Sequence, residues 1–89
     1  MAHQKLKITN IKGLHARASA KLSELAEGFD ATAVVSKDGI EAEADSIMGL
    51  LMLAASHGTS IDVTTSGPEA DNLAEAIAAL VADKFGEGH

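Results

Sequence analysis

Four short stretches of the chain alternate between apolar and polar residues, the pattern of a strand with one buried face. In the first, KLKITN, Leu6 and Ile8 lie on the same side of the chain. The second and third, ATAVVS and IEAEA, flank the dipeptide Asp38-Gly39, which favours a hairpin turn because glycine adopts a positive φ at little cost. The fourth is SIDVTTS at residues 60–66. The residues expected on the buried face of the last two strands are Ile40, Ala42, Ala44, Ile61, Val63 and Thr65.

Other stretches have the three-to-four residue spacing of a helix with one apolar face. The first is predicted over residues 16–27, and Gly28 is a suitable C-terminal stop. The second is a short helix over about residues 46–56, which Gly58 can end. The third is predicted over residues 67–85, with Pro68 in its first turn, where proline is favourable. The tail GEGH that follows is expected to be frayed.

The predicted elements follow the order β-α-β-β-α-β-α and form one domain over residues 1–89. Because each strand has a single apolar face, the helices are expected to cover only one side of the sheet. The fold class is therefore α+β, an open-faced β-sandwich of two layers, with the strand order left open. The helix residues expected to face the sheet are Ala18, Leu22, Leu25, Phe29, Leu73, Ile77, Leu80, Val81 and either Lys84 or Phe85.

The net charge, the length of the apolar runs and the lack of cysteine each disfavour particular classes of protein. The net charge of −6 disfavours nucleic-acid binding, which needs a basic surface to neutralise phosphates. The longest apolar run covers residues 47–55, far shorter than the roughly 20 residues with which a helix crosses a bilayer. The absence of cysteine and of an apolar N-terminal run suits the cytoplasm. We expect a soluble cytoplasmic protein without membrane or nucleic-acid partners, and a monomer by default.

The stretch GLHARASAKL contains the strongest candidate for chemistry. If a helix begins at Ala16, His15 occupies its N-cap position. The backbone N–H groups of Ala16, Arg17 and Ala18 then have no acceptor within the helix. These amides and the helix dipole favour an anion, and the Arg17 guanidinium adds a full positive charge. An imidazole nitrogen of His15 can attack phosphorus, so the stretch predicts a site that accepts and hands on a phosphoryl group.

This candidate site lacks the groups that activate ATP, and a simpler interpretation of it exists. There is no P-loop, no carboxylate pair and no magnesium cluster in the stretch. A histidine in an isolated G-L-H-x-R string can also merely end a loop, although histidine is a poorer N-cap than Ser, Asp or Asn. The other histidines, His3, His57 and His89, lack the spacing of metal ligands, so we expect no metal and no cofactor.

The stretch DSIMGLLMLAA predicts a second surface. The Ser46 hydroxyl is placed to cap the short helix by accepting the Gly49 N–H, and capping alone is a sufficient role for a serine. Leu50, Leu53 and Ala54 lie on one side of this helix, whereas Ile47, Met48, Leu51 and Met52 lie on the other. A small domain cannot easily bury both sides, so we expect the second side to be exposed and to bind proteins. The alternative is a fully buried helix.

The two stretches together resemble one known family. Through GLHAR with His15 and Arg17, DSIMGLLMLAA with Ser46, the GTSIDV strand and the order of elements, residues 4–85 resemble HPr, the histidine-containing phosphocarriers of the bacterial phosphotransferase system. The resemblance implies a four-stranded antiparallel sheet with three helices. It implies that His15 takes a phosphoryl group from phospho-enzyme I, which draws it from phosphoenolpyruvate, and passes it to a histidine of an EIIA-type protein. Arg17 would balance the phosphate charge.

The resemblance also implies regulation and docking. Ser46 matches the serine that HPr kinase/phosphorylase modifies in lineages that have this enzyme. Ile47, Met48 and Leu51 match the apolar docking patch of the family, and Met52 lies beside them. Such a protein is a carrier and not an enzyme with turnover of its own.

One residue departs from the family, and two other functions stay open. Ala18 stands where the family usually has proline, and we expect this change to alter the lability of the phosphohistidine. The first alternative function is a regulatory, nitrogen-related branch of the same system, which signals by binding or phosphorylating regulators. The second is a plain interaction domain in which His15 is incidental.

Overall fold

The computed structural model describes residues 1–88. The strands are β1 (Ala2–Lys7), β2 (Thr32–Lys37), β3 (Ile40–Glu43) and β4 (Ser60–Ser66), the helices are α1 (Ala16–Glu27), α2 (Ile47–Met52) and α3 (Ala70–Ala82), and a 3₁₀ turn, η1, covers Lys84–Gly86. This is the order predicted from the sequence with one turn added at the C-terminal end.

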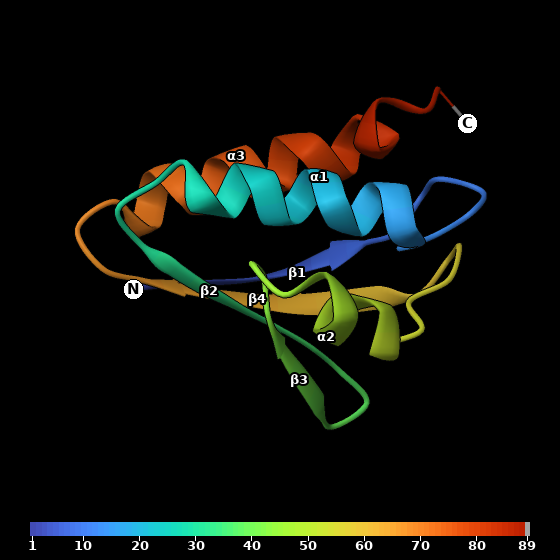
Figure 1. Cartoon of the computed structure of the whole chain (residues 1–89), viewed down its shortest axis with the longest axis horizontal. Helices are drawn as coiled ribbons and strands as arrows, with labels where there is room; N and C mark the ends of the chain where they lie inside the picture. Colours follow the sequence, from blue (N-terminus) through green and yellow to red (C-terminus); the bar gives the residue numbers. More distant parts are fainter. Residues whose placement is uncertain (89) are drawn as a thin grey trace.

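The strands form a single sheet in the order β1-β4-β2-β3, and every neighbouring pair is antiparallel. The last strand in the chain thus lies between the first and the second. Helices α1 and α3 lie side by side across one face of this sheet, and α2 packs against α1 and β3 (Figure 1). The α+β open-faced sandwich predicted from the sequence is confirmed.

The core lies between the sheet and the helices. Leu22 of α1, Ile77 of α3 and Val63 of β4 are almost completely buried, as their spacing predicts. Of the other residues expected to face the sheet, Leu25, Phe29 and Leu80 are only partly buried. Within residues 1–88, no helix is long and apolar enough to span a membrane.

The β2–β3 hairpin confirms its predicted turn and corrects one predicted core residue. Asp38 and Gly39 both have positive φ, 52° and 83°, as the favoured two-residue hairpin turn requires. Ile40 is 50% exposed, although alternation placed it on the buried face. It pairs with Lys37 at the tip of the hairpin, which projects beyond the helices (Figure 1), so no helix covers it.

Helix α2 ends at Met52, and the predictions that it continues to residue 56 and stops at Gly58 are wrong. The Leu53 and Ala54 amides donate to Leu50 and Leu51 in a tight last turn, and Ala54 then adopts a positive φ of 52°. This left-handed residue turns the chain so that Ala55 becomes buried against the loop before α1. Ala54 itself is exposed and does not join the buried side of the helix.

The last helix also differs from its prediction at both ends. Pro68 lies in the turn before α3, because the helix begins at Ala70 with Glu69 as its N-cap residue. At the other end α3 stops at Ala82, and Phe85 reaches the core from η1. Of the predicted frayed tail, Glu87 packs against the domain, and His89 lies outside the described residues.

Candidate functional site

The loop between β1 and α1 is held against the segment that follows α2. The Leu14 N–H donates to the Ala55 carbonyl at 2.8 Å. Gly13 has a φ of +67°, and a Cβ added there would lie 2.5 Å from the same Ala55 oxygen. Only glycine combines this conformation with such a close approach. The contact fixes the point at which the chain reaches His15.

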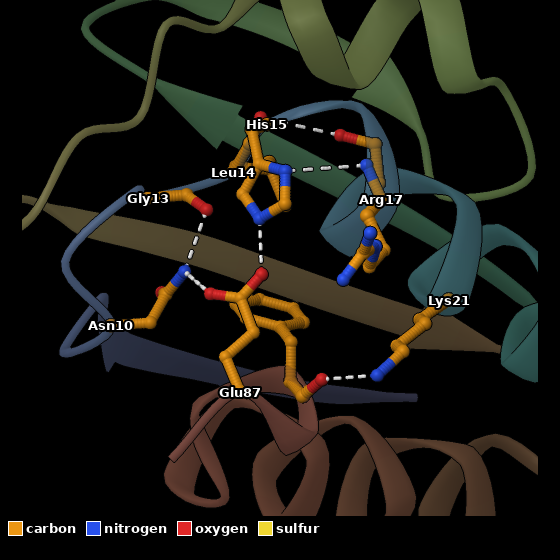
Figure 2. A network of polar contacts seen from close by, with 9 residues as sticks. Asn10, Gly13, Leu14, His15, Arg17, Lys21 and Glu87 are labelled. Carbon is orange, nitrogen blue, oxygen red and sulfur yellow. Dashed lines mark hydrogen bonds and ion pairs between the residues drawn. The ribbon is translucent and has the colours of Figure 1, made fainter. Parts of the chain in front are cut away.

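His15 is the N-cap residue of α1, as predicted. Its backbone is extended and its carbonyl accepts the Ser19 N–H at 2.8 Å, which begins the helix. The ring turns back over the first turn, where Nδ1 accepts the Arg17 N–H at 3.3 Å. On its other side, Nε2 contacts Oε2 of Glu87 (Figure 2). The side chain is 27% exposed, so the ring is accessible from solvent.

Both ring contacts select the same tautomer of His15. A backbone N–H can only donate, so Nδ1 facing the Arg17 amide must carry a lone pair. In a neutral imidazole the proton then lies on Nε2, which faces a carboxylate that can only accept. Nδ1 therefore carries the lone pair, and it lies at the positive end of α1.

Glu87 lies in the site, although the sequence analysis did not predict a carboxylate beside His15. Its side chain is 8% exposed. Asn10, which is fully buried, bridges the two ends of the network: its Nδ2 donates to the Gly13 carbonyl at 2.8 Å and to Oε1 of Glu87 at 2.9 Å. The hydrogen bond from Asn10, and then that from His15, lower the pKa of the Glu87 carboxyl below its usual value, and nearby Lys12 acts in the same direction.

The chain brings Glu87 to His15 through two unusual residues in η1. Lys84 and Phe85 both have positive φ, 54° and 55°, so the chain turns sharply after α3. Phe85 is fully buried, and its carbonyl accepts a hydrogen bond from Nζ of Lys21 at 2.6 Å. The one feature of the sequence that could have indicated this return of the chain is Phe85. Its aromatic side chain is buried and holds the residues that follow it against the domain.

The first turn of α1 offers positive groups to an anion. Arg17 is exposed, and among residues 1–88 its guanidinium has no ion-pair partner. The Ala16 and Ala18 amides likewise have no hydrogen-bond acceptor in that part of the chain. Ala18 has its side chain fully buried, and the effect expected from it on phosphohistidine lability stays a prediction.

Ser46 caps α2 as predicted, because its Oγ accepts the Gly49 N–H at 3.1 Å. The exposed side of this helix is also confirmed: Leu50 is fully buried, whereas Met48 and Met52 are 71% and 72% exposed. The alternative of a fully buried helix is wrong. We call the exposed side the α2 patch; its residues are Ile47, Met48, Leu51 and Met52.

The segment that follows α2 lies near His15. The residues that directly follow α2, 54–56, line a shallow, open hollow of about 230 Å³ together with Leu14 and His15. Within residues 1–88, no group of three or more His, Cys, Asp or Glu side chains could hold a metal ion.

Known proteins resemble the chain over almost its whole length. A family model described as "PTS HPr component phosphorylation site" matches residues 2–83. Phosphocarrier protein HPr of Cupriavidus necator is 47% identical over 81 residues, 91% of each chain. Phosphocarrier protein NPr of Escherichia coli is 44% identical over 85 residues, 94% of each chain.

Solved structures agree with these relatives. HPr-C-His from Thermoanaerobacter tengcongensis superimposes with a TM-score of 0.93 at 33% identity and covers 98% of both chains. The phosphocarrier protein HPr of Bacillus anthracis gives a TM-score of 0.86 at 36% identity, over 90% of this chain and 95% of that one. The likeness thus extends to the sheet order and to the placement of the helices over it.

Proposed function

Because the chain belongs to the PTS HPr family of phosphocarriers, we propose that it carries a phosphoryl group on Nδ1 of His15 between two proteins of the phosphotransferase system. One observation carries the proposal. His15 stands at the N-terminus of α1 with Nδ1 turned toward the Arg17 amide and Nε2 toward Glu87. This leaves one nitrogen as the nucleophile, in a place that favours an anion.

The reaction is a displacement at phosphorus. The Nδ1 lone pair forms a bond to the phosphorus of phospho-enzyme I, and the bond from phosphorus to the donor atom breaks, with the donor keeping the electron pair. The phosphoryl group then leaves Nδ1 for a histidine of an EIIA-type protein by the same step in reverse. The domain is restored after each transfer, so it acts as a carrier and not as an enzyme.

Arg17 and the amides of the first turn hold the transferred group. The Ala16 and Ala18 N–H groups and the Arg17 guanidinium, which has no ion-pair partner within residues 1–88, supply donors and positive charge beside Nδ1. The same groups favour the charge that spreads over the phosphoryl oxygens during transfer.

The α2 patch is the docking surface for enzyme I and for the EIIA-type acceptor. Its exposed methionines adapt to partners of different shape, which suits a carrier that binds two proteins in turn. Ser46, at the edge of this patch, is the site of regulation by HPr kinase/phosphorylase. A phosphate there adds about −2 charge beside Ile47 and Met48 and disfavours docking.

A second role within the same system is a regulatory, nitrogen-related branch. The observation that favours this role is that relatives of similar identity include both a phosphocarrier protein HPr and a phosphocarrier protein NPr. In this role the protein carries the same group on His15 but delivers it to, or withholds it from, regulators. Identifying the EIIA-type acceptor that removes the label from the phosphorylated protein distinguishes the two roles.

Labelling with phosphoenolpyruvate tests the proposed function. The protein is incubated with enzyme I and phosphoenolpyruvate that carries labelled phosphate. We expect an acid-labile label in the wild type and in His57→Ala, a control at an exposed histidine, and none in His15→Ala. An unlabelled wild type would contradict the proposal and favour a plain interaction domain. A label that His15→Ala retains would contradict the assignment of the phosphoryl group to His15.

A further inference from the structure

We propose that Glu87 is a positioning residue for the transfer: it holds the ring proton of His15 on Nε2 and stabilises the positive charge that the ring gains when Nδ1 attacks phosphorus. The inference rests on the proposed function. Glu87 lies beyond residues 2–83, the part of the chain that the family model matches. It reaches the site from the far end of the chain, 72 residues after His15.

The geometry sets one carboxylate against two donors. Oε2 of Glu87 faces Nε2 of His15, and Oε1 accepts Nδ2 of Asn10 at 2.9 Å (Figure 2). Asn10 is in turn fixed by its second donation, to the Gly13 carbonyl at 2.8 Å. The carboxylate is therefore held at both oxygens and is 8% exposed, so its orientation toward the ring is set.

The charge of the ring changes during transfer. When Nδ1 uses its lone pair to bind phosphorus while Nε2 keeps its proton, the imidazole becomes a cation. A carboxylate hydrogen-bonded to Nε2–H stabilises this cation and keeps the ring in its reactive tautomer, as carboxylates do for catalytic and metal-bound histidines. When the phosphoryl group leaves, the electron pair returns to Nδ1 and the ring is neutral again. The proton stays on Nε2 throughout.

A carboxylate at position 87 offers two acceptor oxygens, whereas the corresponding amide offers one acceptor and one donor. The two groups that face it, Asn10 Nδ2 and His15 Nε2–H, are both donors. Glutamine offers one oxygen and one NH₂ group, so in Glu87→Gln either Asn10 or His15 faces another donor. The substitution preserves the size of the side chain but removes the acceptor pair.

The test compares Glu87→Gln with Glu75→Gln, which makes the same change of charge at an exposed position of α3. The ¹⁵N shifts of the His15 ring, recorded in alkaline buffer, report which nitrogen carries the proton. We expect the Nε2–H tautomer in the wild type and in Glu75→Gln, and a mixture of tautomers in Glu87→Gln. Rapid-quench transfer from phospho-enzyme I should be about tenfold slower in Glu87→Gln alone.

Each outcome decides the proposal. A shifted tautomer together with slower transfer supports it, whereas an unchanged tautomer or an unchanged rate in Glu87→Gln overturns it. Failure of the proposed function has a different signature: the wild type then takes no label from phospho-enzyme I. In that case the ¹⁵N spectra still decide whether Glu87 sets the proton position of His15.

Discussion

At the scale of the residue, the setting of His15 depends on groups from separate parts of the chain. Gly13 brings the loop to Ala55, Asn10 ties the loop to Glu87, and Glu87 faces the ring. The first turn of α1 supplies the Arg17 amide to the ring. The position of this histidine therefore depends on tertiary contacts as much as on its place in α1.

The hydrogen bonds that Glu87 accepts from Asn10 and then from His15 lower its pKa and make the stability of the domain depend on pH. The pKa of Glu87 is below its usual 4.5, so the carboxylate stabilises the folded chain above that pH, and its contribution is lost as the pH falls through the folded value. We expect the wild type to melt at a higher temperature than Glu87→Gln at neutral pH. The difference should shrink below about pH 4.5. Thermal melts over a pH series check this, and a difference that does not vary with pH would contradict it.

Gly13→Ala should destabilise the domain more than Gly58→Ala. Both glycines have positive φ, 67° and 88°, but only at Gly13 would the new Cβ meet backbone atoms. Gly58→Ala therefore measures the conformational strain alone, about 1 kcal/mol. The close contact with Ala55 should add about 1–3 kcal/mol in Gly13→Ala. Chemical denaturation of both variants gives the two values, and equal losses would show that the loop yields without cost.

At the scale of the element, α2 is a short helix with one side buried in the core and the other exposed to solvent. Leu50 is buried and holds the helix on the core, while the α2 patch faces solvent. The helix stops at Met52, and the Ala55 carbonyl in the segment that follows accepts the Leu14 N–H from the loop before His15. The segment after the early end of α2 thus lines the hollow beside His15.

Ser46→Asp should slow transfer without unfolding the domain. Aspartate caps a helix as well as serine does and suits the positive end of its dipole, so the melting temperature should hardly change. The new charge beside Ile47 and Met48 should slow transfer from phospho-enzyme I by about tenfold, or roughly 1.4 kcal/mol.

Ser46→Asn provides the matched control, because asparagine is an equally good cap without charge. Transfer rates and melting temperatures of the two variants are measured side by side. Equal transfer rates for Ser46→Asp and Ser46→Asn would contradict the proposal that charge at this position regulates docking.

At the scale of the whole molecule, the sequence predicts what depends on local pattern. The spacing of apolar residues predicted the bounds of α1 correctly, and the dipeptide Asp38-Gly39 predicted the hairpin turn. The position of β4 inside the sheet, the early end of α2 and the return of Glu87 to His15 all depend on contacts between distant residues. A single sequence carries little signal for such contacts, which explains why Asn10 and Glu87 were missed.

The central place of β4 has a consequence for synthesis of the protein on the ribosome. β4 pairs with both β1 and β2, yet it lies at residues 60–66, late in the chain. Among the strands of residues 1–88, β1 pairs with β4 alone, so until β4 emerges the nascent chain can form one of these strand pairs, the β2–β3 hairpin. Such a hairpin is marginally stable alone. The growing polypeptide should therefore fold in one late step, near the end of translation, and expose apolar β1 and α1 side chains to chaperones before it.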